Sequence, residues 1–357
     1  MRNRAEMAFS IAVLVATITN CGPGGTGTGT PGTTSAAWNK LNNSSNGMPD
    51  YPVRAALVDS SDPSSLYVGT YVNGVYFSTD SGQSWQHNAN NLFTTNSRYV
   101  RCLLEAGPYL FAGTEDGAHF ITKVELLNNG LWTSLTQNIL PQNSSIASLC
   151  LGPSNRSTPR VFVSSNTGGI HLIEIPLQTG LQWSRTVDAT ATSALTLRMA
   201  SDPNKKHLFA GTTGGAVRRY ESSGLDSWLV RAGSQSSLNI GQINSLALVD
   251  PTNVDTDLLV GAAGGAYRLS WVNSGWQATS LGLNHGSVQL LKISPIHPSI
   301  LIAESAGQLH RFDGAQWSTL NMQGFSPLPA YDCYLLSPSR IYVGSLNGLW
   351  HTDQVGL

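Results

Sequence analysis

The stretch STDSGQSW, residues 78–85, brings together side chains of the kinds that acid–base catalysis uses. Ser78 supplies a hydroxyl and Asp80 a carboxylate, and Gly82 and Trp85 follow within five residues. A carboxylate placed near a reacting group can serve as a general acid or base. The same residue types also build tight turns, so the spacing alone leaves a catalytic and a structural interpretation open.

A second group of candidates contains two arginines, an aspartate and three tyrosines. Arg54, Arg101 and Asp332 stand at the beginning of short apolar runs, and a tyrosine lies just before each of them: Tyr51, Tyr99 and Tyr331. Guanidinium groups hold carboxylates through paired hydrogen bonds, so such a cluster could grip an anionic group. The alternative is an Arg–Asp ion pair that only neutralises charge within the fold.

Metal sites have weaker support in the sequence. Four histidines follow turn glycines at equivalent places in a repeat: His119, His171, His310 and His351. Equivalent places in successive repeats are separated in space, so these imidazoles cannot converge on one ion. The stretch NVDTD, residues 253–257, offers oxygen ligands without the spacing of a dedicated calcium loop. We expect neither a metal nor any other cofactor.

The elements that position these residues come from a repeat. Seven copies share a short β-rich run, a glycine turn and a second β-rich run: SLYVGTYVNGVYFS, YLFAGTEDGAHFI, RVFVSSNTGGIHLI, HLFAGTTGGAVRRY, DLLVGAAGGAYRLS, SILIAESAGQLHRF and RIYVGSLNGLWHT. The turn glycines are Gly74, Gly117, Gly169, Gly215, Gly265, Gly307 and Gly348. Asn-Gly, Asp-Gly and Gly-Gly pairs are typical of tight hairpins, so each copy contains a hairpin.

Two further strands flank each hairpin. An apolar run precedes it, and a tryptophan follows it in the first six copies: Trp85, Trp132, Trp183, Trp228, Trp276 and Trp317. Four strands repeated every 40 to 50 residues or so indicate the blades of a β-propeller, whose strands we name A to D from the axis outward.

The ends of the chain predict how the ring closes. The seventh copy stops after strand C, while an unassigned SAAWNKL with Trp38 precedes the first copy. We therefore expect an all-β fold, a seven-bladed propeller of four-stranded antiparallel blades, closed when the N-terminal strand pairs with the last blade. Such closure leaves no exposed sheet edge.

The opening stretch resembles the Asp-box, S-x-D-x-G-x-x-W, of BNR-type propellers. These occur in sialidases, some glucan-cleaving enzymes, sortilin-type receptors and the lipoprotein assembly factors of photosystem II. The other copies keep remnants such as TGLQW and DGAQW. The resemblance implies a structural box in the C–D hairpin. There Asp80 accepts hydrogen bonds from the turn, Gly82 adopts a left-handed conformation and Trp85 packs on the neighbouring blade.

The candidate ligand site lies on the opposite face, where the long, polar D–A loops and the B–C turns meet. Alignment of the strand A starts gives Arg54, Arg101, Ser148, Leu195, Ser245, Gln289 and Asp332 at one position around the channel mouth. The candidate binding residues are therefore Arg54, Arg101, Asp332, Tyr51, Tyr99, Tyr331 and Gln289. Polar and aromatic side chains of this kind suit a protein or a glycan partner.

The N-terminus predicts export and anchoring. Two arginines precede the apolar run of residues 7–19, and Cys21 follows, an order that resembles a bacterial lipoprotein signal. We expect a signal peptide over residues 1–20, a lipidated Cys21 in a Gly/Thr-rich tether over 21–35, and one propeller domain over 36–357. The protein would be anchored in a bacterial envelope, with the outer membrane favoured, or simply secreted.

Composition narrows the function further. A net charge of -1 gives no basic field for nucleic acid, so contact with a membrane is expected through the lipid anchor only. A non-catalytic binding or scaffold module is the leading hypothesis. Alternatives are a sialidase-like or glucanase-like glycoside hydrolase and an assembly factor for a membrane complex. For the hydrolase the sequence places no glutamate at the site, since Glu115 and Glu304 are both expected in B–C turns, and it does not show whether Asp50, Asp188 or Asp332 belongs to a facing pair of carboxylates.

Overall fold

The computed structural model describes most of the chain from residue 37 to residue 353. Within that span it leaves out residues 93, 137–138, 142, 154–158, 176–183, 192, 202–205, 223–226, 284–285, 294–300, 321, 323, 326–329 and 338–339, and the side chains of 200–201 and 331–337. The expected signal peptide, Cys21, the tether and Trp183 therefore lie outside the described residues.

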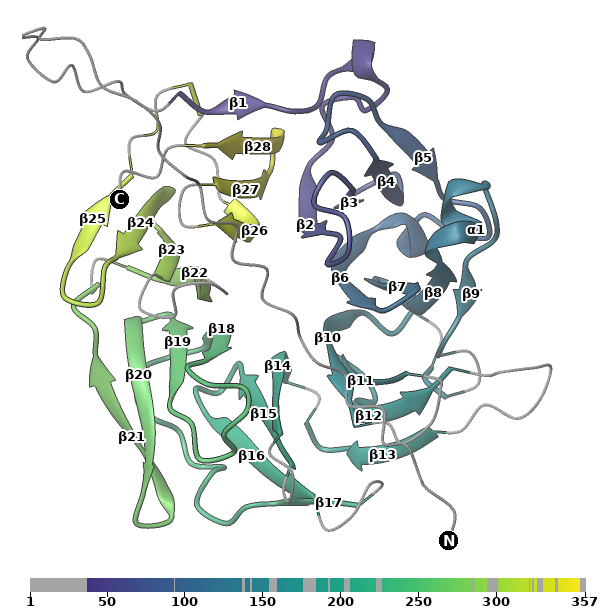
Figure 1. Cartoon of the computed structure of the whole chain (residues 1–357). Coiled ribbons are helices and arrows are strands. Elements are labelled where there is room, and N and C mark those ends of the chain that lie inside the picture. The colour runs from purple at the N-terminus through teal and green to yellow at the C-terminus, as the bar shows by residue number, and fades with distance from the viewer. Residues whose placement is uncertain are drawn as a thin grey trace, which may run out of the picture. The chain divides into compact units, whose positions relative to one another are not determined.

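Seven four-stranded antiparallel sheets form a ring, as expected (Figure 1). The first three blades are β2 (Val53–Val58), β3 (Leu66–Thr70), β4 (Val75–Ser78) and β5 (Gln86–Asn88); β6 (Val100–Ala106), β7 (Tyr109–Thr114), β8 (Gly117–Thr122) and β9 (Thr133–Ser134); and β10 (Ile146–Gly152), β11 (Arg160–Ser165), β12 (Gly169–Glu174) and β13 (Ser184–Asp188). A short helix, α1 (Lys123–Leu127), joins β8 to β9.

The next three blades have the same order. They are β14 (Ala194–Ser201), β15 (Lys206–Thr212), β16 (Val217–Ser222) and β17 (Trp228–Val230); β18 (Ile243–Leu248), β19 (Leu258–Ala262), β20 (Gly265–Val272) and β21 (Gly275–Ser280); and β22 (Val288–Ile293), β23 (Leu301–Ser305), β24 (Gln308–Phe312) and β25 (Trp317–Thr319). The strand A elements lie on the inner side of the ring (Figure 1).

The seventh blade joins the two ends of the chain. It contains β26 (Ala330–Ser337), β27 (Arg340–Ser345) and β28 (Gly348–Thr352), and β1 (Asn39–Lys40) pairs with β28 as its outer strand. Trp38 is buried against Phe325, with ring centroids 5.2 Å apart. The predicted closure by the N-terminal strand is confirmed.

The glycine turns and the tryptophans lie where the repeat predicts. All seven turn glycines have positive φ angles, from 73° to 130°. At Gly169 a Cβ would come within 2.1 Å of a backbone oxygen, so only glycine fits there. The described tryptophans of the repeat stand at or next to the start of strand D. Three of them donate their indole N–H to a carbonyl of the preceding blade: Trp85 to Leu41, Trp276 to Val217 and Trp317 to Leu281.

Neighbouring blades pack through one position of strand B. In five blades this residue is glycine, and an added Cβ would come within 2.4–2.8 Å of a valine or isoleucine on strand A of the next blade. The glycines are Gly69, Gly113, Gly211, Gly261 and Gly344. The strand pairing puts Ser164 and Glu304 at this position in the other two blades, and the next strand A there begins with alanine, Ala194 or Ala330. Glu304 was expected in a B–C turn, but it lies within β23. The small side chain of Ala330 on the next strand A leaves room for it there.

Candidate functional site

The STDSGQSW stretch forms the hairpin between β4 and β5. Gly82 has a φ of 87°, and the Asp80 carboxylate accepts hydrogen bonds from the Ser84 N–H and from the Ser78 hydroxyl, 2.9 and 2.7 Å long. The hydrogen bonds from Ser84 and Ser78 hold the pKa of Asp80 below its ordinary value. Trp85 is buried and binds the carbonyl of Leu41. The Ser78 hydroxyl and the Asp80 carboxylate are thus bonded within the turn and Trp85 is bonded to the neighbouring blade, which suits a structural role better than acid catalysis.

A bulge marks the start of every strand A. The pairing with strand B skips one residue in each blade, and the skipped residues are Arg54, Arg101, Ala147, Leu195, Asn244, Gln289 and Tyr331. The sequence analysis had assigned Ser148, Ser245 and Asp332 to this ring. Each of them is the residue that follows the bulged one. The correction follows from the bulge, which adds a residue that the apolar pattern does not reveal.

The residue after the bulge in each strand A has a different role. The hydroxyl of Ser148 accepts the N–H of Leu197, and the hydroxyl of Ser245 donates to the carbonyl of Leu291, so both bind the next blade. The pairing places the backbone of Asp332 at this same position, opposite Gly344. The side chains of Asp332 and Tyr331 lie outside the described residues.

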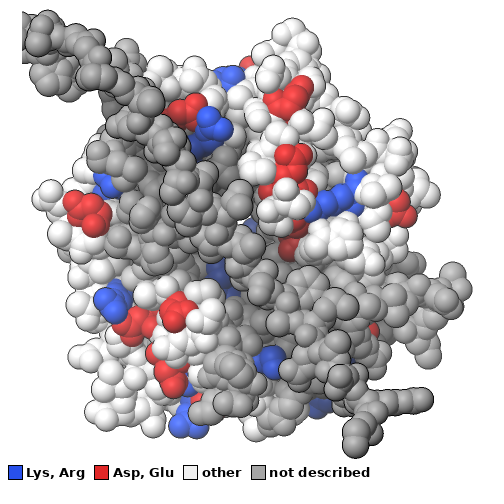
Figure 2. Space-filling view, viewed as in Figure 1, with Lys and Arg blue, Asp and Glu red and all other residues white. Residues whose placement is uncertain are grey.

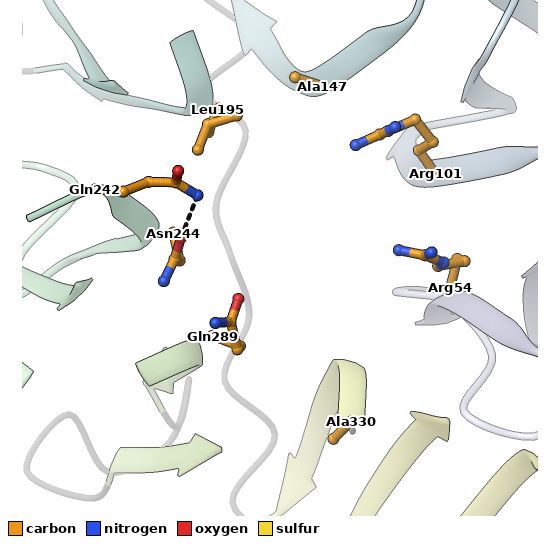
Figure 3. A pocket seen from close by; sticks show the side chains of 8 residues that line it. All are labelled: Arg54, Arg101, Ala147, Leu195, Gln242, Asn244, Gln289 and Ala330. Carbon is orange, nitrogen blue, oxygen red and sulfur yellow. Dashed lines mark hydrogen bonds between the residues drawn. The ribbon is translucent and has the colours of Figure 1, made fainter. Parts of the chain in front are cut away.

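Six of the seven bulged residues line a cavity of about 390 Å³ at the mouth of the channel, and the side chain of the seventh, Tyr331, lies outside the described residues. Its described lining consists of Arg54, Arg101, Ala147, Leu195, Gln242, Asn244, Gln289 and Ala330. Figure 3 shows the two arginines entering from one side and the three amide side chains facing them from the other. Gln242 donates a hydrogen bond to Asn244, 2.8 Å long. Of the predicted binding residues, the structure brings Arg54, Arg101 and Gln289 together here.

Arg101 has an acidic partner that the sequence did not assign to it. Its guanidinium lies 2.6 Å from the carboxylate of Glu115, in the turn after β7. Burial raises the pKa of Glu115, but the hydrogen bonds from Ser145 and Arg101 and the charges of Arg101 and Arg54 outweigh it, so the pKa lies below its ordinary value. Glu115 stays ionised and steadies Arg101. The sequence held one sign of this pair. Glu115 lies in the B–C turn beside Gly117, and B–C turns share a face with the starts of the A strands.

The aromatic neighbours only partly match the prediction. The Arg54 guanidinium lies over the ring of Tyr71, 4.9 Å from its centroid, and Tyr71 stacks on Tyr99 with centroids 4.7 Å apart. Tyr99 therefore stacks on Tyr71, and Tyr71 in turn contacts Arg54. The sequence analysis did not include Tyr71 among the candidate residues. Tyr51 packs against Tyr76 in the apolar cluster between the seventh and first blades. It takes part in the core and does not belong to the described lining of the cavity.

Other kinds of site find less support in the described part of the chain. No three or more His, Cys, Asp or Glu side chains gather there into a metal cluster. Burial lowers the pKa of His119 to about 4, so this imidazole is neutral near pH 7. No helix among the described residues is long and apolar enough to cross a membrane. The coloured side chains in Figure 2 form small groups of both signs.

Comparison with known proteins supports the fold. No family model and no curated protein matches the sequence. Among solved structures, YCF48 from Cyanidioschyzon merolae is 13% identical over 89% of this chain and 99% of its own, with a TM-score of 0.63. YCF48 bound to a D1 peptide is also 13% identical, over 90% of this chain and 97% of its own, with a TM-score of 0.62.

A bacterial structure is similar as well. The extracellular domain of BT3049 from B. thetaiotaomicron, described as a hybrid two-component system, is 12% identical over 89% of this chain and 42% of its own, with a TM-score of 0.64. At these identities the likeness establishes a β-propeller and nothing finer.

Proposed function

We propose that this propeller is a non-catalytic binding module of the bacterial cell envelope that holds a protein partner on the face of the D–A loops. The observation that carries the proposal is the cavity at the centre of that face. Two guanidinium groups, Arg54 and Arg101, face three side-chain amides across it. This set is rich in hydrogen-bond donors and carries positive charge.

Such a cavity suits an anionic group of the partner. Arginine binds carboxylates through two parallel hydrogen bonds, and the amides opposite can complete the coordination. A volume of about 390 Å³ admits a side chain or a chain end, while the surrounding loops contact the rest of the partner. The YCF48 structure with a D1 peptide gives a precedent for peptide binding by a propeller that this chain covers over 97% of its length.

The glycoside hydrolase alternative lacks its central feature in the described lining of the cavity. A glycoside hydrolase needs two carboxyl groups that face each other across roughly 5 to 10 Å. The described lining of the cavity contributes no Asp or Glu. A glycan could use the amides and Tyr71, but two arginines and Glu115 at the mouth favour a charged ligand.

Anchoring belongs to the same proposal. A lipidated Cys21 would hold the module at a membrane of the cell envelope.

The test is affinity capture from envelope extracts with the double variant Arg54→Gln/Arg101→Gln. Arg268→Gln is the control, because Arg268 is exposed on β20 and pairs with Asp257 away from the channel. We expect one protein to be captured by the wild type and the control and lost with the double variant. Retention by the double variant would contradict the proposal, as would hydrolysis of a glycan in a parallel assay.

A further inference from the structure

Three large apolar side chains are exposed on the face of the cavity, in the B–C turns of the seventh and first blades. Tyr71 is 39% exposed, Val72 38% and Leu346 44%. The ring centroid of Tyr71 lies 4.9 Å from the guanidinium carbon of Arg54, which lines the cavity. The two blades are neighbours in the ring (Figure 1). We call Tyr71, Val72 and Leu346 the turn patch.

The repeat shows that the fold does not require apolar side chains in these turns. Tyr71 and Leu346 each directly follow strand B of their blade. In the other five blades the same position has a small or polar residue: Glu115, Asn166, Thr213, Ala263 and Ala306. Grouped, exposed apolar side chains commonly mark a contact surface. The two departures from the repeat therefore point to binding and not to folding.

The loop between β1 and β2 holds both turns in place. The side chain of Asn42 accepts the N–H of Leu349, just after the turn of the seventh blade, at 2.8 Å. The carbonyl of Pro52 accepts the N–H of Tyr71 at 2.9 Å. Met48 of the same loop is buried in the apolar cluster between these two blades. The turn patch is therefore ordered before a partner binds, which favours affinity.

The polar groups next to the turn patch already have partners. Asp50 lies 2.8 Å from the ammonium group of Lys40, which also donates a hydrogen bond to Asn347. The amide of Asn73 donates to the hydroxyl of Tyr76 at 2.7 Å. A small apolar surface with a polar rim is typical of protein interfaces, whereas surfaces that lie on membranes are usually rich in Lys and Arg. The turn patch therefore suits a protein segment.

We propose that the turn patch binds an apolar side chain of the protein partner, close along the partner's chain to the acidic group that the cavity holds. The inference rests on the proposed function, to which it adds a second recognition element. The two elements are neighbours because Tyr71 contacts Arg54. An extended segment advances roughly 3.3 Å per residue, so the partner carries a large apolar residue within about three residues of an Asp or Glu.

The experiment is selection of a phage-displayed library of random dodecapeptides on the full chain in detergent. We expect the selected peptides to be enriched in pairs of an acidic and a large apolar residue at this spacing. In fluorescence anisotropy, Val72→Ser/Leu346→Ser should weaken the binding of a selected peptide about tenfold, the effect of leaving an apolar side chain without its contact. Val124→Ser/Leu127→Ser is the matched control and should leave the affinity unchanged, because these apolar side chains are also exposed but belong to α1.

Val72→Ile/Leu346→Met keeps the apolar surface and should bind the peptide as the wild type does, which separates loss of the contact from damage to the fold. Enrichment of acidic residues alone would overturn the inference and leave the proposed function standing. Apolar enrichment that persists in Arg54→Gln/Arg101→Gln would contradict the proposed role of the cavity and leave the turn patch as a binding surface. The inference is also overturned if no peptide is selected, or if the control weakens binding as much as Val72→Ser/Leu346→Ser; the capture assay decides the proposed function separately.

Discussion

Glu304 offers a sharp test of how the blades pack. Its side chain is 3% exposed, and one carboxylate oxygen accepts the N–H of Gly307 at 2.9 Å. The other oxygen is buried and has no hydrogen-bond partner among the described residues. Burial raises the pKa of Glu304 and outweighs the hydrogen bond from Gly307. The folded protein therefore favours the protonated carboxyl, and ionisation opposes folding.

The raised pKa of Glu304 makes the stability of the fold depend on pH. A carboxyl whose pKa is higher in the folded than in the unfolded state contributes stability fully below the unfolded pKa, and this contribution is lost as pH rises through the folded pKa. Glu304→Gln removes the ionisation and keeps the shape. We expect the variant to gain about 1 to 3 kcal/mol at pH 8, the usual cost of a buried unsatisfied polar group, and to match the wild type near pH 4.

Thermal melts from pH 4 to pH 8 measure this difference, and Glu115→Gln is the matched control. The pKa of Glu115 is lowered in the fold, so its contribution is present above the unfolded pKa and lost as pH falls through the folded pKa. Glu115→Gln should therefore lose stability near pH 7 and converge with the wild type in acid. The reasoning is refuted if Glu304→Gln is no more stable than the wild type at pH 8.

Three further predictions concern closure, packing and anchoring. Deletion of residues 36–41 removes β1 and should cause aggregation or a large drop in melting temperature; a monomeric, stable product in size-exclusion chromatography would contradict the closure. Gly113→Ala places a Cβ 2.5 Å from Cys102 Sγ and should cost about 1 to 3 kcal/mol in urea unfolding, whereas Gly275→Ala, with its nearest neighbour at 4.0 Å, should be neutral. Cys21→Ser should abolish palmitate labelling and release the protein from the membrane fraction; unchanged fractionation would argue against lipidation.

The ring could be predicted from the sequence because its main determinants are local. A glycine with positive φ and a tryptophan at the start of strand D recur at regular distances. Both residue types can be recognised directly in the sequence, as at Gly117 and Trp276. The incomplete last repeat and the extra Trp38 then required the two ends to pair.

The site could be predicted only in part because its details depend on register and on contacts between blades. A bulge moves Ala147 and Asn244 into the ring where Ser148 and Ser245 were expected, and the apolar pattern is the same in both registers. The Arg101–Glu115 pair and the stacking of Arg54 on Tyr71 join residues that are 14 and 17 positions apart. Their spacing in the sequence does not indicate that these residues are in contact in the folded blade.

The proposed partner sits over the cavity, and site-specific photo-crosslinking in cells tests this most directly. Gln242 is exposed and lines the cavity, and Gln83 is also exposed, in the C–D hairpin of the first blade on the opposite face. A photoreactive residue at position 242 should crosslink to one envelope protein, and the yield should fall when Arg54 and Arg101 are changed to Gln. The same residue at position 83 should give no such product. Crosslinking from position 83 with none from position 242 would contradict the account.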